Sequence, residues 1–241
     1  VRSEGGGLIL ITRKSKVKEY YAEILGGSTN HNGFSPLITV PSSNAQSKLI
    51  LDACDEASIT TDMIDYFECH GTGTKIGDPI EVNGLKDIIN KDRKNICYLG
   101  SIKSNIGHLE SGAGIAGIIK SILILIHQKI PKNIHIKKIN ENLNLHNKMK
   151  IVTENIDKNI NIIGISGFGF GGSNGHILLK KSNLKKNLSN IHMENKGFLI
   201  NRKYNNSINK NKPKNKVKVK KNYSNNSINY KKFIKLNEEI G

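Results

Sequence analysis

Three clusters of glycine and polar residues interrupt this chain, and each follows a short apolar run. They are Cys69–Thr74 (CHGTGT), Lys103–His108 (KSNIGH) and Gly167–Asn174 (GFGFGGSN). Short apolar runs bounded by glycine-rich turns are typical of buried strands. Loops at the ends of such strands are where α/β proteins usually build their sites. The clusters therefore predict an α/β fold with its chemistry in these three loops.

The segments around the clusters alternate between strand and helix patterns. Apolar runs predict strands over 20–27, 63–68, 96–99, 161–166 and 175–179, and a further strand over 8–12 that forms a hairpin with 20–27. Apolar residues at a spacing of four predict a helix from Ser42 onward. The segment 112–127 is apolar almost all round and predicts a buried helix. This alternation is typical of an α/β core.

The segment after the first cluster carries the pattern of a helix start. Asp78 can cap the helix, Pro79 suits the first helical position, and Glu81 stands where a capping box places its acidic residue. We therefore expect a helix that begins at this point.

The charge of the chain changes near residue 180. The whole chain carries a net charge of +17, of which residues 1–180 account for +4 and residues 181–241 for +13. The Asn- and Lys-rich tail cannot bury enough apolar surface to offset its ordering entropy. The sequence predicts a folded domain over 1–180 and a disordered basic tail over 181–241. Nucleic-acid binding by the tail is an alternative, but aromatic residues are sparse there and no binding fold is apparent, so no nucleic-acid partner is expected.

Cysteine usage and hydropathy suggest a reducing compartment. Three cysteines, Cys54, Cys69 and Cys97, are too few for a disulfide framework. The longest apolar stretch, 113–126, is interrupted by Lys120 and is short for a membrane span. We expect a cytoplasmic protein without a membrane span. The chain opens with VRSEGGG rather than with Met, which suggests a fragment.

Each cluster lies within a longer block that resembles a signature of β-ketoacyl synthases. The blocks are HGTGTKIGDPIE (70–81), GSIKSNIGHLESGAGIAG (100–117) and GFGFGGSNGHI (167–177), in the family's order and at near-family spacing. They are most similar to the ketosynthase domains of type I polyketide synthases and multifunctional fatty acid synthases. The resemblance covers 1–180 and implies a thiolase-like layered αβαβα fold, of which the chain matches mainly the C-terminal half.

This resemblance implies an acyltransferase that performs decarboxylative Claisen condensation. An acyl thioester is joined to a malonyl-type extender on acyl carrier protein, in fatty acid or polyketide biosynthesis. His70 and His108 match the family's two active-site histidines, and Lys103 matches its lysine. Aimed N–H donors stabilise the charge that develops on the extender as it loses CO2. His108 stands just before a predicted helix, whose dipole favours the neutral imidazole.

Substrate-binding residues and partners also follow from the resemblance. Thr72 and Thr74 match hydroxyls that hold the phosphopantetheine arm of the carrier protein, which is the substrate carrier. Phe168 matches a gating aromatic whose N–H helps form an oxyanion hole, and Gly169 gives that backbone room. No metal and no directly bound cofactor are implied. The expected partners are acyl carrier protein, a second copy in a homodimer, and other domains of a multifunctional synthase.

The cysteine nucleophile of the family has no counterpart in this chain. Cys54 stands beside Asp55 and Glu56, and acidic neighbours disfavour a thiolate. Cys69 aligns with an ordinary residue of the family. We therefore expect a fragment that supplies the histidines and the lysine without the nucleophile. The alternative is a non-catalytic remnant or a scaffold module with a basic tail.

Two other sites compete for the same residues. The stretch GFGFGG fits the dinucleotide fingerprint, but a strand pattern follows it where that fingerprint needs a helix. Cys69, His70 and His108 are residue types that bind zinc, but no closely spaced ligand pair supports a zinc site.

Overall fold

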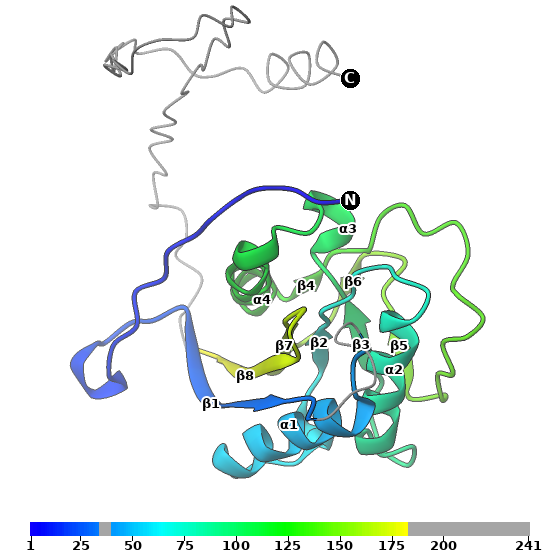
Figure 1. Cartoon of the computed structure of the whole chain (residues 1–241). Helices are drawn as coiled ribbons and strands as arrows, with labels where there is room; N and C mark the ends of the chain where they lie inside the picture. The colour runs from blue at the N-terminus through cyan, green and yellow to red at the C-terminus, as the bar shows by residue number, and fades with distance from the viewer. Residues whose placement is uncertain (34–39, 183–241) are drawn as a thin grey trace, which may run out of the picture. The chain divides into compact units, whose positions relative to one another are not determined.

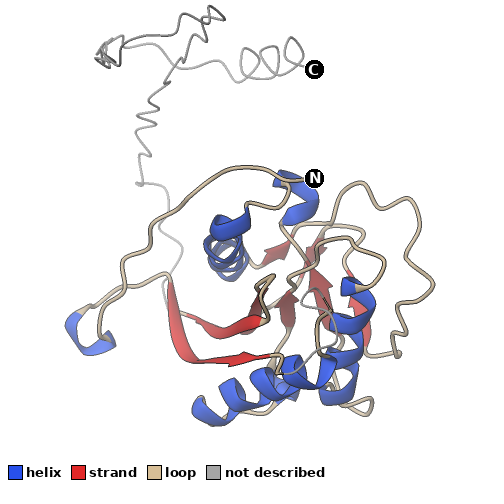
Figure 2. Ribbon diagram, in the orientation of Figure 1, coloured by secondary structure: helices blue, strands red, loops and turns tan. Residues whose placement is uncertain are grey.

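A six-stranded mixed sheet organises the part of the chain that the structure, a computed structural model, describes: residues 1–33 and 40–182 (Figures 1 and 2). The strand order is β1 (Ala22–His31), β8 (Ser173–Lys181), β7 (Ile162–Phe168), β2 (Tyr66–Glu68), β3 (Cys97–Gly100) and β5 (Met149–Ile151). Strands β7, β2, β3 and β5 run parallel, while β8 is antiparallel to β7 and β1. A small sheet pairs β4 (Lys129–Ile130) with β6 (Ile156–Asp157). Apart from residues 181 and 182, the predicted tail lies outside the described residues.

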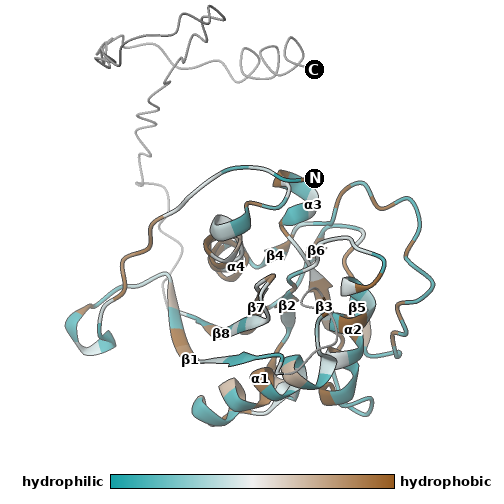
Figure 3. Cartoon of the chain, viewed as in Figure 1, coloured by the Kyte–Doolittle hydropathy of each residue, from teal (hydrophilic) through white to brown (hydrophobic). Residues whose placement is uncertain are grey.

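The helices cover both faces of the large sheet. They are α1 (Ser43–Glu56), α2 (Gly77–Ile88), the single turn α3 (Lys103–Ile106) and α4 (Ala113–His127), with 3₁₀ turns η1 (Lys14–Lys16), η2 (Thr61–Met63) and η3 (Glu110–Gly112). One apolar cluster packs α1 and α2 on one face of the sheet, and a second packs α4 on the other. Figure 3 shows the apolar residues of these helices. The described residues therefore form an α/β/α sandwich.

The predicted hairpin of 8–12 with 20–27 is wrong. Strand β1 forms, but it pairs with β8, and residues 8–12 are not a strand. Leu8 and Leu10 are almost fully exposed. The first residues of the chain lie near His108 and α4. Ser3 N–H donates to the carbonyl of His108, and a Cβ at Gly7 would lie 3.0 Å from Ile115 Cγ1. Residues 3–7, which lead into the run, therefore lie on the α4 side of the fold, and the run itself is not paired with β1.

The predicted capping box before α2 is also wrong. Helix α2 begins at Gly77, whose N–H donates to Thr74 Oγ1 over 2.9 Å. Asp78 accepts from the N–H of Gly73, and Glu81 turns back to the chain before the helix. Both carboxylates bond the glycine-rich loop because its N–H groups have no strand or helix partner of their own.

Helix α4 is less buried than its apolar sequence predicts. Lys120 and Ile124 are buried, whereas Ile119 and Leu123 are 38% and 48% exposed. The exposed side lines an open, mostly apolar groove of about 610 Å³. All-round burial is therefore wrong for this helix within the described part of the chain.

One described segment, Glu110–His127, is long and apolar enough to cross a membrane when only length and composition are considered. The apolar stretch 113–126 forms most of this segment. A single such helix is weak evidence for a span, because core helices of soluble proteins have the same properties. Lys120, near the middle of this segment, forms a buried ion pair with β2.

Candidate active site

The three glycine-rich clusters meet at one edge of the sheet. The first cluster follows β2, the second follows β3, and the third forms the turn between β7 and β8. Strands β7, β2 and β3 are parallel neighbours, so their carboxyl ends lie at the same edge. The sheet order alone therefore brings together segments that are far apart in the sequence.

Aromatic rings from all three clusters are in contact. The His70 and His108 ring centroids are 5.4 Å apart with an interplanar angle of 84°, which is an edge-to-face arrangement. The Phe168 ring centroid lies 5.5 Å from that of His70. The structure thus places the two predicted catalytic histidines and the predicted gating aromatic side by side.

Both histidine rings accept a backbone hydrogen bond at Nδ1. The N–H of Phe168 donates to His70 over 3.3 Å, and the N–H of Glu110 donates to His108 over 3.0 Å. A neutral imidazole has one donor and one acceptor nitrogen. Each ring therefore carries its proton on Nε2, and the site presents two Nε2–H donors.

The Phe168 N–H does not lie in an oxyanion hole in this structure, because it is donated to His70. The turn after it is folded back on itself: Gly169 N–H donates to the carbonyl of Ser173 over 2.7 Å, and Gly172 N–H donates to the carbonyl of Gly169. Opening this turn would be needed to turn the Phe168 N–H toward a substrate oxygen.

Backbone pairing holds His108 in place. Its N–H donates to the carbonyl of Val1 and its carbonyl accepts from Ser3, so residues 1–3 run beside it as a short parallel bridge. Gly107, just before it, has a φ of +76°, a conformation that L side chains rarely adopt. Glycine at 107 therefore allows the sharp exit from α3 that presents the His108 ring.

Burial and neighbouring charge keep both histidines neutral. Burial lowers the pKa of His70 to about 3, with Lys103 and then His108 adding to the effect. Burial and then Lys103 also lower the pKa of His108, while Glu110 opposes them. The neutral His108 that we predicted from a helix dipole is therefore due mainly to burial and to the nearby lysine.

Burial and the charges of nearby carboxylates act in opposite directions on the pKa of Lys103. It is half-buried at the start of α3, and burial lowers its pKa, while Glu81 and then Glu68 raise it. Its charge in turn lowers the pKa of both histidines. Lys103 is thus linked by charge to both rings.

Glu81 is a site residue that sequence reasoning missed. Its two carboxylate oxygens accept from the N–H groups of His70 and Gly71, over 2.7 and 2.9 Å. Burial raises the pKa of Glu81 to about 7, although these two hydrogen bonds oppose the change. The capping-box interpretation hid this role, because it assigned Glu81 to its own helix.

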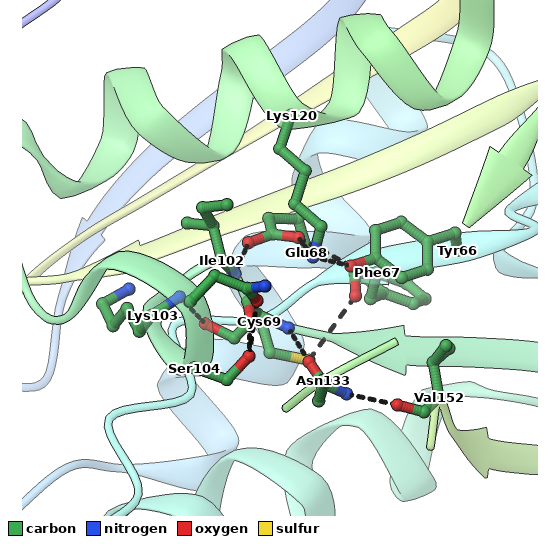
Figure 4. Close-up of polar contacts among 12 residues, drawn as sticks. Tyr66, Phe67, Glu68, Cys69, Ile102, Lys103, Ser104, Lys120, Asn133 and Val152 are labelled. Carbon is green, nitrogen blue, oxygen red and sulfur yellow. Dashed lines mark hydrogen bonds and ion pairs between the residues drawn. The ribbon is translucent and has the colours of Figure 1, made fainter. Parts of the chain in front are cut away.

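A second missed group lies beneath the site. Glu68 and Lys120 form an ion pair of 2.8 Å in which both side chains are almost fully buried, and Tyr66 OH bonds to both (Figure 4). A lone Glu at the end of an apolar strand and a lone Lys in an apolar helix were signals that could have predicted this pair.

The two predicted pantetheine-binding threonines lie together on the first loop. Their hydroxyl oxygens are 3.4 Å apart, and Thr74 Oγ1 also accepts from the first N–H of α2. Thr74 is exposed and Thr72 is half-buried. Thr74 therefore has a structural contact that Thr72 lacks.

All three cysteines are poor nucleophiles in this structure. Burial raises the pKa of the Cys54 thiol to about 11 and that of Cys97 to about 12. For Cys69, burial followed by Glu81 and Glu68 raises the pKa well above its usual value. None of them is held as a thiolate.

The competing sites find no support in the described residues. The GFGFGG stretch joins two antiparallel strands, so no helix N-terminus stands behind it for a dinucleotide phosphate. Within residues 1–33 and 40–182 no three His, Cys, Asp or Glu side chains are grouped as metal ligands.

Two family models match this chain, and the first of them includes the first two glycine-rich clusters. The family model described as beta-ketoacyl synthase, C-terminal domain, matches residues 21–137, and the model described as ketoacyl-synthetase C-terminal extension matches residues 140–230. The second match runs across residue 180, so the boundary that charge suggests there stays a prediction.

Similar proteins are polyketide synthases. The chain is 43% identical to the highly reducing polyketide synthase Preu1 of Preussia isomera over 73% of its length, and 37% identical to the polyketide synthase PksL of Bacillus subtilis over 75%. It spans only 8% and 4% of the lengths of these two proteins.

Solved ketosynthase structures share the fold. The oxazolomycin ketosynthase domain OzmH KS7 of Streptomyces albus JA3453 matches with a TM-score of 0.68 and 32% identity, covering 72% of this chain and 32% of that one. The ketosynthase from module 6 of the bacillaene synthase of Bacillus subtilis 168 matches with a TM-score of 0.62 and 32% identity, covering 68% and 31%. The predicted thiolase-like α/β fold is thereby confirmed. The family models, the relatives and the shared fold together show that this chain belongs to the β-ketoacyl synthase family, as a C-terminal portion of a ketosynthase domain of the polyketide synthase type.

Proposed function

We propose that this chain supplies the extender-binding part of a ketosynthase site that performs decarboxylative Claisen condensation. The observation that carries the proposal is the pair of contacting histidines that both present Nε2–H. A malonyl-type thioester carried by acyl carrier protein would place its carbonyl oxygen against these donors. Donors fixed before the reaction stabilise the charge that appears in the transition state.

The reaction that this arrangement suits has two steps. The bond between the extender's α-carbon and its carboxylate breaks, CO2 leaves, and the electron pair passes into an enolate whose oxygen the Nε2–H groups of His70 and His108 stabilise. The enolate carbon then attacks an acyl thioester on a cysteine, and that cysteine leaves as a thiolate. Burial, with the charge of Lys103 adding to it, lowers the pKa of both rings and keeps them neutral, so that each ring donates from Nε2 while its Nδ1 accepts a backbone hydrogen bond.

The acyl-accepting thiol is not among the three cysteines of this chain, because each has a raised pKa. Thr72 and Thr74 are proposed to hold the phosphopantetheine arm, and acyl carrier protein, a second copy of the chain and other synthase domains are the proposed partners. This chain is therefore expected to decarboxylate an extender slowly and not to condense it.

Incubation with malonyl-loaded acyl carrier protein, with and without acyl-loaded carrier, tests the proposal. Mass spectrometry should show acetyl carrier protein but no condensation product, and His108→Ala should lower decarboxylation about 100-fold. Lys48→Ala, at an exposed position of α1, is the surface control. Decarboxylation that is unchanged by His108→Ala would contradict the extender site and favour a non-catalytic remnant. Robust condensation would contradict the assignment of the cysteines.

A further inference from the structure

The carboxylate of Glu68 joins three segments around the site. Its Oε1 accepts from the N–H of Ile102 over 2.6 Å, where α3 begins. Its Oε2 accepts from Tyr66 OH over 2.6 Å and pairs with Lys120 Nζ over 2.8 Å (Figure 4). Strand β2, the start of α3 and the middle of α4 therefore meet at one buried side chain.

We propose that Glu68 is a positioning residue that sets where Lys103 stands relative to His70. Glu68 comes two residues before His70 in the chain, and Ile102, which it binds, comes directly before Lys103. The Glu68 carboxylate thus links the strand that leads to His70 with the turn that carries Lys103. The inference deepens the proposed function and rests on it for the chemical role of Lys103.

Helix α3 needs such an external contact because it is only four residues long. A single helical turn is not stable by itself, and the first N–H groups of a helix lack partners within it. The N–H of Lys103 has a long contact of 3.4 Å to Ser101 Oγ, whereas the Ile102 N–H has the short bond to Glu68. Glu68 therefore supplies the strongest acceptor at the start of this turn, since a charged acceptor makes the stronger hydrogen bond.

The buried charges of Glu68 and Lys120 are tolerated because these two side chains and Tyr66 OH bond to one another. Lys120 Nζ donates to Tyr66 OH over 2.8 Å as well as pairing with Glu68, and the tyrosine hydroxyl donates to Glu68. Removing one member would leave the opposite charge buried without a partner, which is more damaging than removing both. A test that replaces Glu68 must therefore replace Lys120 as well.

Two glycines make the room that this group occupies. A Cβ at Gly100 would lie 2.5 Å from Tyr66 OH, and a Cβ at Gly117 of α4 would lie 3.2 Å from Glu68 Cγ. By contrast, a Cβ at Gly114 in the same helix would meet nothing within 4 Å. Gly117→Ala and Gly114→Ala are therefore a matched pair, because only the first adds a methyl group that contacts Glu68.

The first experiment compares Gly117→Ala with Gly114→Ala in the whole chain. Both add one methyl group to α4, but only Gly117→Ala should move the Glu68 side chain. We expect Gly117→Ala to lower kcat for malonyl decarboxylation about 10-fold at an unchanged KM, because small misplacements of catalytic groups are costly. It should also shift the amide NMR signals of Ile102 and Lys103, while Gly114→Ala leaves kcat and these signals at the parental values. Equal effects of the two substitutions would overturn the proposal.

The second experiment uses two double variants of equal charge. Glu68→Gln with Lys120→Met keeps an oxygen acceptor for the Ile102 N–H, whereas Glu68→Leu with Lys120→Met removes it. We expect kcat within about 3-fold of the parent for the first and a loss of about 10- to 100-fold for the second. Equal kcat in the two variants would overturn the proposal. Should the leucine variant not fold, a large loss of kcat in the folded glutamine variant would overturn it as well.

Failure of the proposed function can be distinguished from failure of the positioning role, because the first is seen in activity and the second in the amide NMR signals. A parent chain without decarboxylation would refute the extender site, yet the amide signals of Ile102, Lys103 and His70 would still report positioning. We expect these signals to be preserved in the glutamine double variant and displaced in the leucine double variant or in Gly117→Ala. Signals that are identical in all variants would overturn the positioning role irrespective of activity.

Discussion

The backbone N–H of Phe168 donates to Nδ1 of His70 over 3.3 Å, which places the ring proton of His70 on Nε2. The turn between β7 and β8 thereby selects the tautomer of a histidine that lies on the loop after β2. The resemblance to ketosynthases predicts both residues at the site, but it assigns the Phe168 N–H to a substrate oxygen. In this structure that N–H orients the histidine instead.

The two nitrogens of His70 can be tested separately. Glutamine places its amide N–H near the position of Nε2, whereas asparagine places its amide near Nδ1. We expect His70→Gln to retain about 10-fold more malonyl decarboxylation than His70→Asn, since loss of a transition-state donor costs a factor of about 100 or more. Initial rates of CO2 release check this. Equal rates for the two variants would show that Nε2–H is not the group that acts on the extender.

The two threonines of the first loop should behave differently on substitution. Thr74→Val removes the oxygen that accepts from Gly77 N–H at the start of α2, so it should lower the free energy of unfolding by about 1 kcal/mol. Thr72→Val has no such contact to remove and should leave stability unchanged. If both hydroxyls hold the pantetheine arm, both variants raise KM for malonyl carrier protein. Thermal melts and steady-state kinetics separate the two effects, and a stability loss shared equally by both variants would contradict this division.

Glu81 should introduce a pH dependence near neutrality. Its pKa is raised to about 7, so the carboxylate gains a proton as the pH falls through this value. The protonated oxygen is a weaker acceptor, and the N–H groups of His70 and Gly71 are then held less firmly. We expect kcat for decarboxylation to fall as the pH is lowered from 8 to 6.

Glu81→Gln should lower kcat and remove this pH step, while Glu154→Gln, an exposed control paired with Lys150, should retain it. The pKa of His70 of about 3 keeps that ring neutral throughout the range. A pH step that persists in Glu81→Gln would assign the step to another group.

His176 should make the fold sensitive to acid. It is a buried residue of β8, and Ser166 Oγ lies 2.9 Å from its Nδ1. Burial lowers its pKa from 6.5 to about 3. Between these two values the unfolded chain binds a proton that the folded chain does not, so stability falls as the pH is lowered through this window. We expect the parent to lose up to about 4 kcal/mol relative to His176→Gln between pH 7 and pH 3.

Ser166→Ala is the matched control for this effect. It removes the hydroxyl partner of His176 but not the titrating ring, so it should lower the free energy of unfolding by about 1 kcal/mol at every pH. Its dependence on pH should therefore run parallel to that of the parent. Urea unfolding at a series of pH values measures both quantities, and a parental curve parallel to that of His176→Gln would refute the role of His176.

Local patterns predicted the parts of the fold that depend on local physics. The apolar runs before the three clusters became β2, β3 and β7, because a strand buried on both faces reads as a continuous apolar run. The helix predicted from Ser42 onward is α1, which begins after Ser42, and the Ser42 hydroxyl accepts from Ala45 N–H as an N-cap.

Failures occurred where a residue had more than one possible partner. The run 8–12 is apolar enough for a strand, but apolarity does not say which edge accepts it. Glu81 stands where a capping box places its acidic residue. Its carboxylate instead accepts from the N–H groups of His70 and Gly71, which lie in the loop before the helix. Glu68 and Lys120 are far apart in sequence, so their pairing depends on the packing of α4 on β2.

The pairing of β1 with β8 has a consequence for how the chain is made. Strand β1 ends at His31, and its partner β8 begins only at Ser173, so β1 leaves the ribosome long before its partner exists. At roughly 5–20 residues per second, the delay is on the order of ten seconds. During that time β1 is an unpaired edge that other chains can pair with. The Phe168 turn that orients His70 emerges just before β8, so among the described residues the candidate site is completed only when β8 has been made.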